Sequence, residues 1–89
     1  MSAFASSKFA LRALSTSIAK EFAPRGVHVA HAIIDGVIDT PMTKEWLKDA
    51  PPEGKIAADD IAETYWNLHT QGRRCFTNEI DIRPMLEKW

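Results

Sequence analysis

The residues best placed for chemistry stand near the start of the chain, in the run Phe4-Ala5-Ser6-Ser7-Lys8. On a helix, Phe4 and Lys8 lie on one face, one turn apart. A tyrosine at position 4 would form an acid–base pair with Lys8, because an ammonium group stabilises a nearby phenolate. Phenylalanine has no proton to give, so the spacing of such a pair is present while its acid is missing.

Two other groups of residues contain nucleophiles, but each lacks a partner that its chemistry would need. Ser6 and Ser7 stand beside Lys8, as in a serine–lysine pair, but the sequence offers no oxyanion donor and serines are common on helix faces. Cys75 follows two arginines, which favour a thiolate, but a redox role would need a second cysteine and the chain has one. An ordinary exposed serine pair and an ordinary thiol are the simpler interpretations.

Composition sets the class of protein. The 89 residues allow one small domain, and a net charge of −1 argues against a nucleic-acid module, which would carry a basic stripe. A single cysteine excludes an internal disulfide and favours a reducing, cytoplasmic setting. The apolar runs are too short to span a membrane.

An alternative location comes from the first twenty residues. They contain Lys8, Arg12 and Lys20, several serines and no acidic residue, which is also the composition of a mitochondrial transit peptide. The same segment runs directly into a well-formed helix end, which a cleaved leader would not need. We therefore prefer the helix and keep the mitochondrial location as a minor alternative.

A long helix over residues 3–23 is predicted to position Lys8. Its large apolar residues recur at helical spacing and form one stripe, and Pro24 with Gly26 ends it. The stripe consists of Phe4, Leu11, Leu14, Ile18 and Phe22. A neighbouring face of small residues, Ala10, Ala13 and Ser17, would let another helix approach closely.

A strand over residues 27–34 follows, apolar on both faces as in a buried parallel sheet. His28 and His31 are three residues apart, so on a strand they point to opposite faces and do not share a metal ion. We expect partly buried histidines with backbone partners instead, and no metal site.

The second half of the chain predicts a loop, two helices and a strand. Gly36 allows a tight turn after the first strand, and Thr40 before Pro41 is typical of a helix start, here a short helix over 41–49. A helix over 58–71 has Asp60 and Glu63 at capping-box spacing. Its expected buried face comprises Ile61, Ala62, Tyr65, Trp66 and Leu68. A last strand covers 77–83, with Ile80 and Ile82 on one face.

This order of elements predicts an α/β fold with two parallel strands, forming one unit over residues 1–89. Two strands make a marginal sheet, and the first would present a long apolar edge. We therefore expect a homo-oligomer in which the apolar stripe of the first helix packs against a partner.

Three collinear stretches resemble the short-chain dehydrogenase/reductase family, in its C-terminal part. FASSKFALRALSTSIAKEFAPRGVHV looks like the family's Tyr-x-x-x-Lys helix and the strand after it. IDGVIDTPM looks like its Pro-Gly-x-x-x-Thr loop, and DDIAETYWNLHTQGRRCFTNEIDIRP looks like its last helix and strand. The resemblance implies the C-terminal part of a Rossmann-like fold that oxidises alcohols or reduces carbonyls with NAD(P). It also implies that Lys8 binds the nicotinamide ribose and that Ile38 and Thr40 neighbour the carboxamide and phosphate. Related folds, by the same resemblance, dimerise through the first helix and the last strand, so we expect the homo-oligomer to associate through both.

The chain departs from the family pattern at several positions. Phe4 stands where the catalytic tyrosine belongs, and Asp35 stands where the loop proline belongs. The family's serine and asparagine partners fall in upstream sequence that these residues do not include. The four glycines are at least ten residues apart, so no glycine-rich phosphate turn can be formed among them.

Three functional hypotheses follow. In the first, the chain is a piece of an NAD(P)-dependent oxidoreductase that lacks cofactor binding and catalysis unless the missing half is supplied. In the second, it is a non-catalytic oligomerisation or interaction module derived from that family. In the third, which we rank last, it is an enzyme of unrecognised chemistry. The substrate and the choice between NAD and NADP are not encoded in any motif of these residues.

Overall fold

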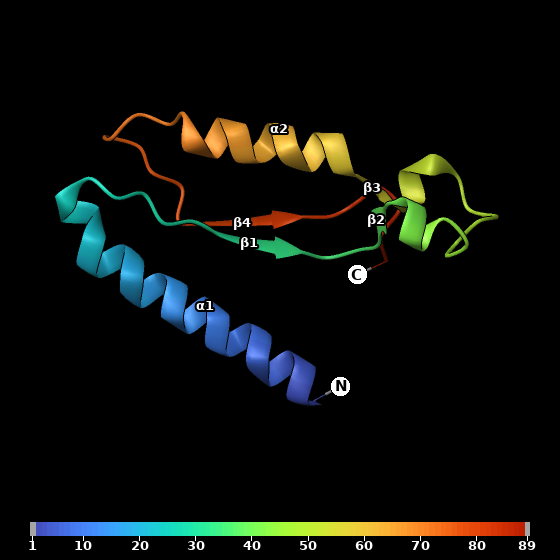
Figure 1. The fold of residues 1–89 in the computed structure, drawn as a ribbon, viewed down its shortest axis with the longest axis horizontal. Coiled ribbons are helices and arrows are strands. Elements are labelled where there is room, and N and C mark those ends of the chain that lie inside the picture. The colour runs from blue at the N-terminus through green and yellow to red at the C-terminus, as the bar shows by residue number, and fades with distance from the viewer. Residues whose placement is uncertain (1, 89) are drawn as a thin grey trace. The chain divides into compact units, whose positions relative to one another are not determined.

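The structure is a computed structural model that describes residues 2–88 (Figure 1). Its contacts group into two units, the first taking in the chain up to His31 together with 71–80, and the second taking in 32–70 and the chain from Asp81 onward. The elements are α1 (Ser2–Phe22), β1 (His31–Ile34), β2 (Ile38–Asp39), β3 (Ile56–Ala57), α2 (Ala58–His69) and β4 (Glu79–Ile82), with 3-10 turns at Ala23–Arg25, Pro41–Thr43 and Pro52–Gly54.

Helix α1 dominates the first unit. It is rich in alanine, leucine, lysine and arginine, which favour helix, and its observed bounds differ from the predicted 3–23 by one residue at each end. Gly26 has φ +84° and donates its backbone N–H to the Ala23 carbonyl (2.9 Å), so the predicted left-handed terminator is confirmed. A β-branched residue could not adopt that φ without strain.

The first strand is shorter than predicted. Only His31–Ile34 pairs as β1, whereas residues 27–30 are extended without being part of a ladder. A side chain binds the opposite segment there instead of the backbone: His28 donates from Nε2 to the Thr77 carbonyl (2.7 Å) and stacks on Phe76, with ring centroids 4.1 Å apart. The expectation of a histidine with a backbone partner is thus confirmed for His28.

Strand β4 is also shorter than the predicted 77–83. Thr77 bonds to the side chain of Gln71. The Gln71 Nε2 donates to the Thr77 hydroxyl (2.7 Å), and the Gln71 Oε1 accepts the Thr77 backbone N–H (2.8 Å). Within β4, Ile80 and Ile82 are half-buried and the two acidic residues are exposed, as the alternation predicted.

Strands β1 and β4 form a two-stranded sheet. The hydrogen bonds from His31 to Asn78 (2.9 Å) and from Asp35 to Ile82 (2.8 Å) advance in the same direction along both segments, so the pair is parallel (Figure 1). This is the predicted pair of parallel strands, and it confirms the α/β class.

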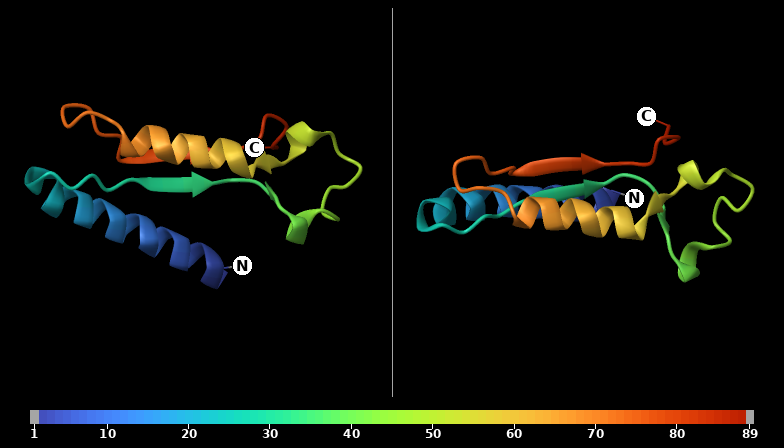
Figure 2. Two further views of the ribbon diagram at one scale, coloured as in Figure 1. Left: turned by 45° about the horizontal axis from the view of Figure 1, so that its top comes forward. Right: turned by 90° about the horizontal axis from the view of Figure 1, so that it is seen from above.

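The second unit contains a parallel pair that the sequence did not predict. Strand β2 pairs with β3 in the register Ile38↔Ile56 and Asp39↔Ala57. Figure 2 shows the intervening residues as a long excursion that leaves this pair and rejoins it. Strands of two residues carry no periodic pattern, which is why the segment was expected to be loop.

The predicted helix over 41–49 is wrong. One 3-10 turn, Pro41–Thr43, is followed by hydrogen-bonded turns, and Leu47 has φ +53°. The Thr43 carbonyl accepts the N–H of Trp46 (2.9 Å) rather than that of a residue four positions on. A left-handed leucine is incompatible with a continuing helix, so the segment turns instead.

Helix α2 begins at Ala58 and ends at His69, two residues before the predicted end. The expected Asp60–Glu63 capping box is wrong, because Ala57 occupies the N-cap position. Asp59 and Asp60 lie in the first turn instead, where their charges complement the helix dipole. The helix stops where Thr70 donates both its backbone N–H and its hydroxyl to the Trp66 carbonyl, each at 3.0 Å.

Little of the chain's apolar surface is covered. Among residues 2–88, Ala19 and Ile56 are the only buried hydrophobic side chains apart from the buried Pro84. The predicted buried face of α2 is only partly correct, since Ile61 and Leu68 are half-buried, but Ala62, Tyr65 and Trp66 are exposed. The N-terminal part of the apolar stripe on α1 is exposed as well, at Phe4, Leu11 and Leu14.

Candidate functional site

Lys8 and Phe4 have the one-turn relationship that their spacing predicted. The Lys8 Nζ lies 5.4 Å from the centroid of the Phe4 ring, within the range of a cation–π contact. Ser7 donates its hydroxyl to the Phe4 carbonyl (2.8 Å). That bond occupies the Ser7 hydroxyl proton within its own helix, which argues against a Ser7–Lys8 nucleophile.

The loop after β1 depends on Gly36. Its φ is +147°, and a Cβ at this position would lie 2.6 Å from the Cδ of Pro84, closer than two non-bonded carbon atoms approach. The glycine therefore meets two requirements at once, an unusual backbone conformation and a close approach. The chain that follows Gly36 contains Ile38, which is half-buried, and Thr40, which is the N-cap residue of the Pro41–Thr43 turn.

Asp35, at the position where the resemblance places a proline, makes bonds that a proline could not. Its backbone N–H bonds to the Ile82 carbonyl (2.8 Å), and its Oδ2 accepts from Nη1 of Arg83 (2.8 Å). Arg83 also binds Asp81 Oδ2 (2.6 Å), and its side chain is 18% exposed. Asp35 therefore extends the attachment of this loop to β4.

Thr43 is a residue that the sequence analysis missed. Its hydroxyl donates to the Ile38 carbonyl and accepts the backbone N–H of Thr40 (3.0 Å). The Thr40 hydroxyl lies 3.2 Å from the same oxygen. One half-buried hydroxyl thus joins the two loop residues that the resemblance assigns to the cofactor.

Lys55 was missed as well. Its Nζ donates to the Thr43 carbonyl (2.8 Å) and lies 3.5 Å from the Lys44 carbonyl. No local pattern could have indicated this contact, because the two partners are twelve positions apart in the sequence. A threonine three positions after Thr40, at capping-box spacing, was the available signal for Thr43.

The structure joins only some of the predicted site residues. Ile38 and Thr40 meet through Thr43 in the second unit, whereas Lys8 and Phe4 belong to the first unit. His31 does not pair with His28: its Nδ1 lies 3.5 Å from Glu79 Oε1, which also accepts from Arg12 Nε (2.7 Å).

Within residues 2–88, no group of three or more histidine, cysteine or acidic side chains is arranged to hold a metal ion. The helices in the same range are also too short or too polar to cross a bilayer.

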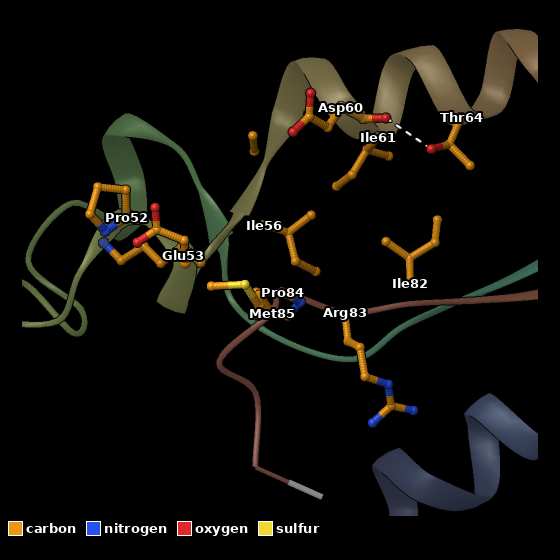
Figure 3. Close-up of a pocket in the computed structure, with 12 residues that line it drawn as sticks. Pro52, Glu53, Ile56, Asp60, Ile61, Thr64, Ile82, Arg83, Pro84 and Met85 are labelled. Carbon is orange, nitrogen blue, oxygen red and sulfur yellow. Dashed lines mark hydrogen bonds between the residues drawn. The ribbon is translucent and has the colours of Figure 1, made fainter.

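A hollow of about 410 Å³ lies elsewhere in the second unit, between the start of α2, β3 and the end of β4 (Figure 3). Ile56, Ile61 and Ile82 face it from these three elements, while the Arg83 guanidinium points away. It includes none of the residues predicted to bind the cofactor. The same lining also includes the charged residues Glu53, Lys55 and Asp60.

Parallel strand pairs, with α2 in the connection between β3 and β4, define the class of the protein, a partial Rossmann-like α/β unit. The family model described as short chain dehydrogenase matches residues 1–51. The chain belongs to the short chain dehydrogenase family.

Curated relatives agree with this assignment. An uncharacterized oxidoreductase of Staphylococcus epidermidis is 35% identical over 82 residues, which cover 92% of this chain and 34% of the relative. Uncharacterized oxidoreductases of Staphylococcus aureus are 30% identical over the same coverage. The chain therefore spans about a third of the length of these relatives. No solved structure gives a significant match.

Family membership implies NAD(P), so the residues present can be tested for fit. The nicotinamide side fits in part: Lys8 is an exposed cation, Ile38 lies in β2, and Thr40 caps the turn that follows it. The pyrophosphate side does not fit. The two glycines with positive φ are occupied by neighbours, since Gly26 lies against the Arg73 guanidinium and Gly36 against Pro84. Neither forms a cradle for a phosphate.

Proposed function

We propose that this chain is the C-terminal part of an NAD(P)-dependent oxidoreductase, and that on its own it neither binds the cofactor nor catalyses a reaction. One observation supports the proposal: Lys8 is exposed and Thr40 caps a turn, as a nicotinamide-side role would require, while neither Gly26 nor Gly36 cradles a phosphate. In folds of this type the glycine-rich turn and the strands next to it supply most of the cofactor contacts. A reducing, cytoplasmic setting accords with an exposed single cysteine, Cys75.

Each residue has a role once the other part of the fold is supplied. The Lys8 ammonium would bind ribose hydroxyls, and the backbone of Ile38 with the Thr40 hydroxyl would position the carboxamide and a phosphate. NAD(P), when bound, supplies or accepts the hydride. Phe4 can shape the site and exclude water, but it cannot protonate an alkoxide.

The test is complementation. The chain is mixed with the part of the Staphylococcus epidermidis relative that it does not cover, and NADH and NADPH are titrated into each part and into the mixture. We expect binding by the mixture and none by this chain. Binding by the chain alone would contradict the proposal, and so would a mixture that forms a complex without binding either cofactor.

A second candidate is a non-catalytic module that associates through its exposed surfaces. The observation in its favour is the apolar stripe of α1, where Phe4 is 61% and Leu14 is 57% exposed. We propose a homo-oligomer through α1 and β4, since β4 has one neighbouring strand in its sheet. A chain that self-associates but does not combine with the complementary part would favour this candidate over the first.

A further inference from the structure

The Thr43 side chain completes the bonding of the Ile38–Thr40 segment. The Val37 carbonyl is bonded across to the Ile56 N–H (2.8 Å). Carbonyls on a strand alternate in direction, so the Ile38 carbonyl points away from β3 and needs another donor. The Thr43 hydroxyl is that donor, and it also accepts the Thr40 N–H (3.0 Å).

Lys55 fixes Thr43 in turn. Its ammonium donates to the Thr43 carbonyl (2.8 Å), at the end of the Pro41–Thr43 turn where the helix dipole favours a cation. Lys55 directly precedes β3, so the same residue anchors the return of the chain to β2. The Ile38–Thr40 segment is thus held by the β2–β3 strand pair and by the Thr43–Lys55 hydrogen bond.

We infer that Thr43 and Lys55 are positioning residues that hold the Ile38–Thr40 segment in its cofactor-binding shape before any cofactor arrives. The inference rests on the proposed function only in taking Ile38 and Thr40 as cofactor neighbours. Pre-ordering matters because binding energy is lost whenever a loop must be ordered on binding. The Thr40 hydroxyl lies 3.2 Å from the Thr43 hydroxyl oxygen and is the donor in that contact, because Thr43 donates its own proton to the Ile38 carbonyl.

The first arm of the test uses the chain alone and does not involve a cofactor. Hydrogen exchange of the Thr40 amide is compared in the unsubstituted chain, Thr43→Val, Thr43→Ser and Thr16→Val. Valine keeps the shape and removes both bonds, so we expect Thr40 exchange to speed up about tenfold or more. Serine keeps the hydroxyl and should restore the protection to within about twofold. Thr16 bonds only to the Arg12 carbonyl on exposed α1, so Thr16→Val should change nothing at Thr40.

Amides of α2 serve as the reference for global unfolding in every variant. If Thr43→Val also speeds the exchange of these α2 amides, Lys55→Met decides, because it removes the Lys55 hydrogen bond and leaves the Thr43 side chain in place. We expect Lys55→Met to speed Thr40 exchange about threefold or more. Lys48→Met, which removes a surface lysine 3.8 Å from Glu45, should have no effect. Unprotected Thr40 in the unsubstituted chain, or exchange unchanged by both Thr43→Val and Lys55→Met, would overturn the inference.

The second arm uses the complex with the complementary part of the relative. Thr43→Val and Lys55→Met should weaken NADH binding about fivefold or more, and Thr43→Ser should restore it. Unchanged affinity, with Thr40 exchange increased, would overturn the claim that the order serves the cofactor. An unsubstituted complex that binds no cofactor would instead overturn the proposed function, while the exchange arm would still decide whether Thr43 orders the segment.

Discussion

The Lys8 ammonium lies 5.4 Å from the centre of the Phe4 ring, one helical turn away. A cation over an aromatic face is a weak contact at an exposed site, about 0.5–1 kcal/mol. With tyrosine at position 4 the same geometry would place a phenol one turn from an ammonium. The helix therefore has the spacing of an acid–base pair, with an aromatic ring at the position where the resemblance places the acid.

Restoring the phenol should restore the acid. In the complex with the complementary part of a relative, Phe4→Tyr is expected to raise NADH-dependent carbonyl reduction by roughly 10²–10⁴-fold, the usual contribution of general acid catalysis. Phe9→Tyr is the matched control, because it adds the same phenol on the same helix at a 66% exposed position outside the one-turn spacing. An unsubstituted complex that reduces carbonyls as fast as Phe4→Tyr would mean that another group is the acid.

The α1 stripe should hold an oligomer together. Leu14 is 57% exposed in the single chain, and burying such a side chain contributes about 1.5–3 kcal/mol. We expect sedimentation at micromolar concentration to show no dominant monomer and Leu14→Asp to dissociate or unfold the assembly. The small residues Ala10, Ala13 and Ser17 should lie at the helix–helix contact.

Thr16→Asp is the control for that experiment, since it adds the same charge at an exposed polar position of α1. It should leave the sedimentation profile unchanged. A stable monomer that tolerates Leu14→Asp would mean that the chain covers its stripe without a second copy.

Two glycines should respond to the same substitution in opposite ways. Gly36→Ala should destabilise the chain by more than about 1–3 kcal/mol, because φ +147° is strained for alanine and the new Cβ would lie 2.6 Å from Pro84. At Gly72 a new Cβ would meet no neighbouring atom within 4 Å, so Gly72→Ala should be neutral or stabilise by about 0.4–1 kcal/mol. Urea unfolding of both variants measures the difference, and equal midpoints would contradict the assigned role of Gly36.

Local sequence patterns predicted the long elements of this fold. The α1 stripe, the Gly26 terminator and the alternation of Ile80 and Ile82 depend on neighbours in sequence, and each is observed. The helix over 41–49 failed because Pro41 and Thr40 indicated a start, while nothing in the pattern indicated that Leu47 would turn left-handed. The exposure of Tyr65 and Trp66 could not be predicted from the period of α2, which marks a face but not what covers it.

The candidate site likewise contains some contacts that local sequence patterns predicted and others that they could not predict. The Phe4–Lys8 spacing and the Thr40 N-cap are local and were predicted. The Lys55–Thr43 contact and the Asp35–Arg83 ion pair join residues far apart in sequence, so only the folded chain brings them together.

The central claim is that this chain carries the nicotinamide side of an oxidoreductase site without the means to bind the cofactor by itself. Calorimetric titration of the isolated chain with NADH and NADPH tests it most directly. The predicted result is no saturable binding tighter than a Kd of roughly 100 μM, about 5.5 kcal/mol. Saturable binding below that concentration, abolished by Lys8→Met and retained by Lys20→Met, would contradict the claim and show that these residues form a cofactor site unaided.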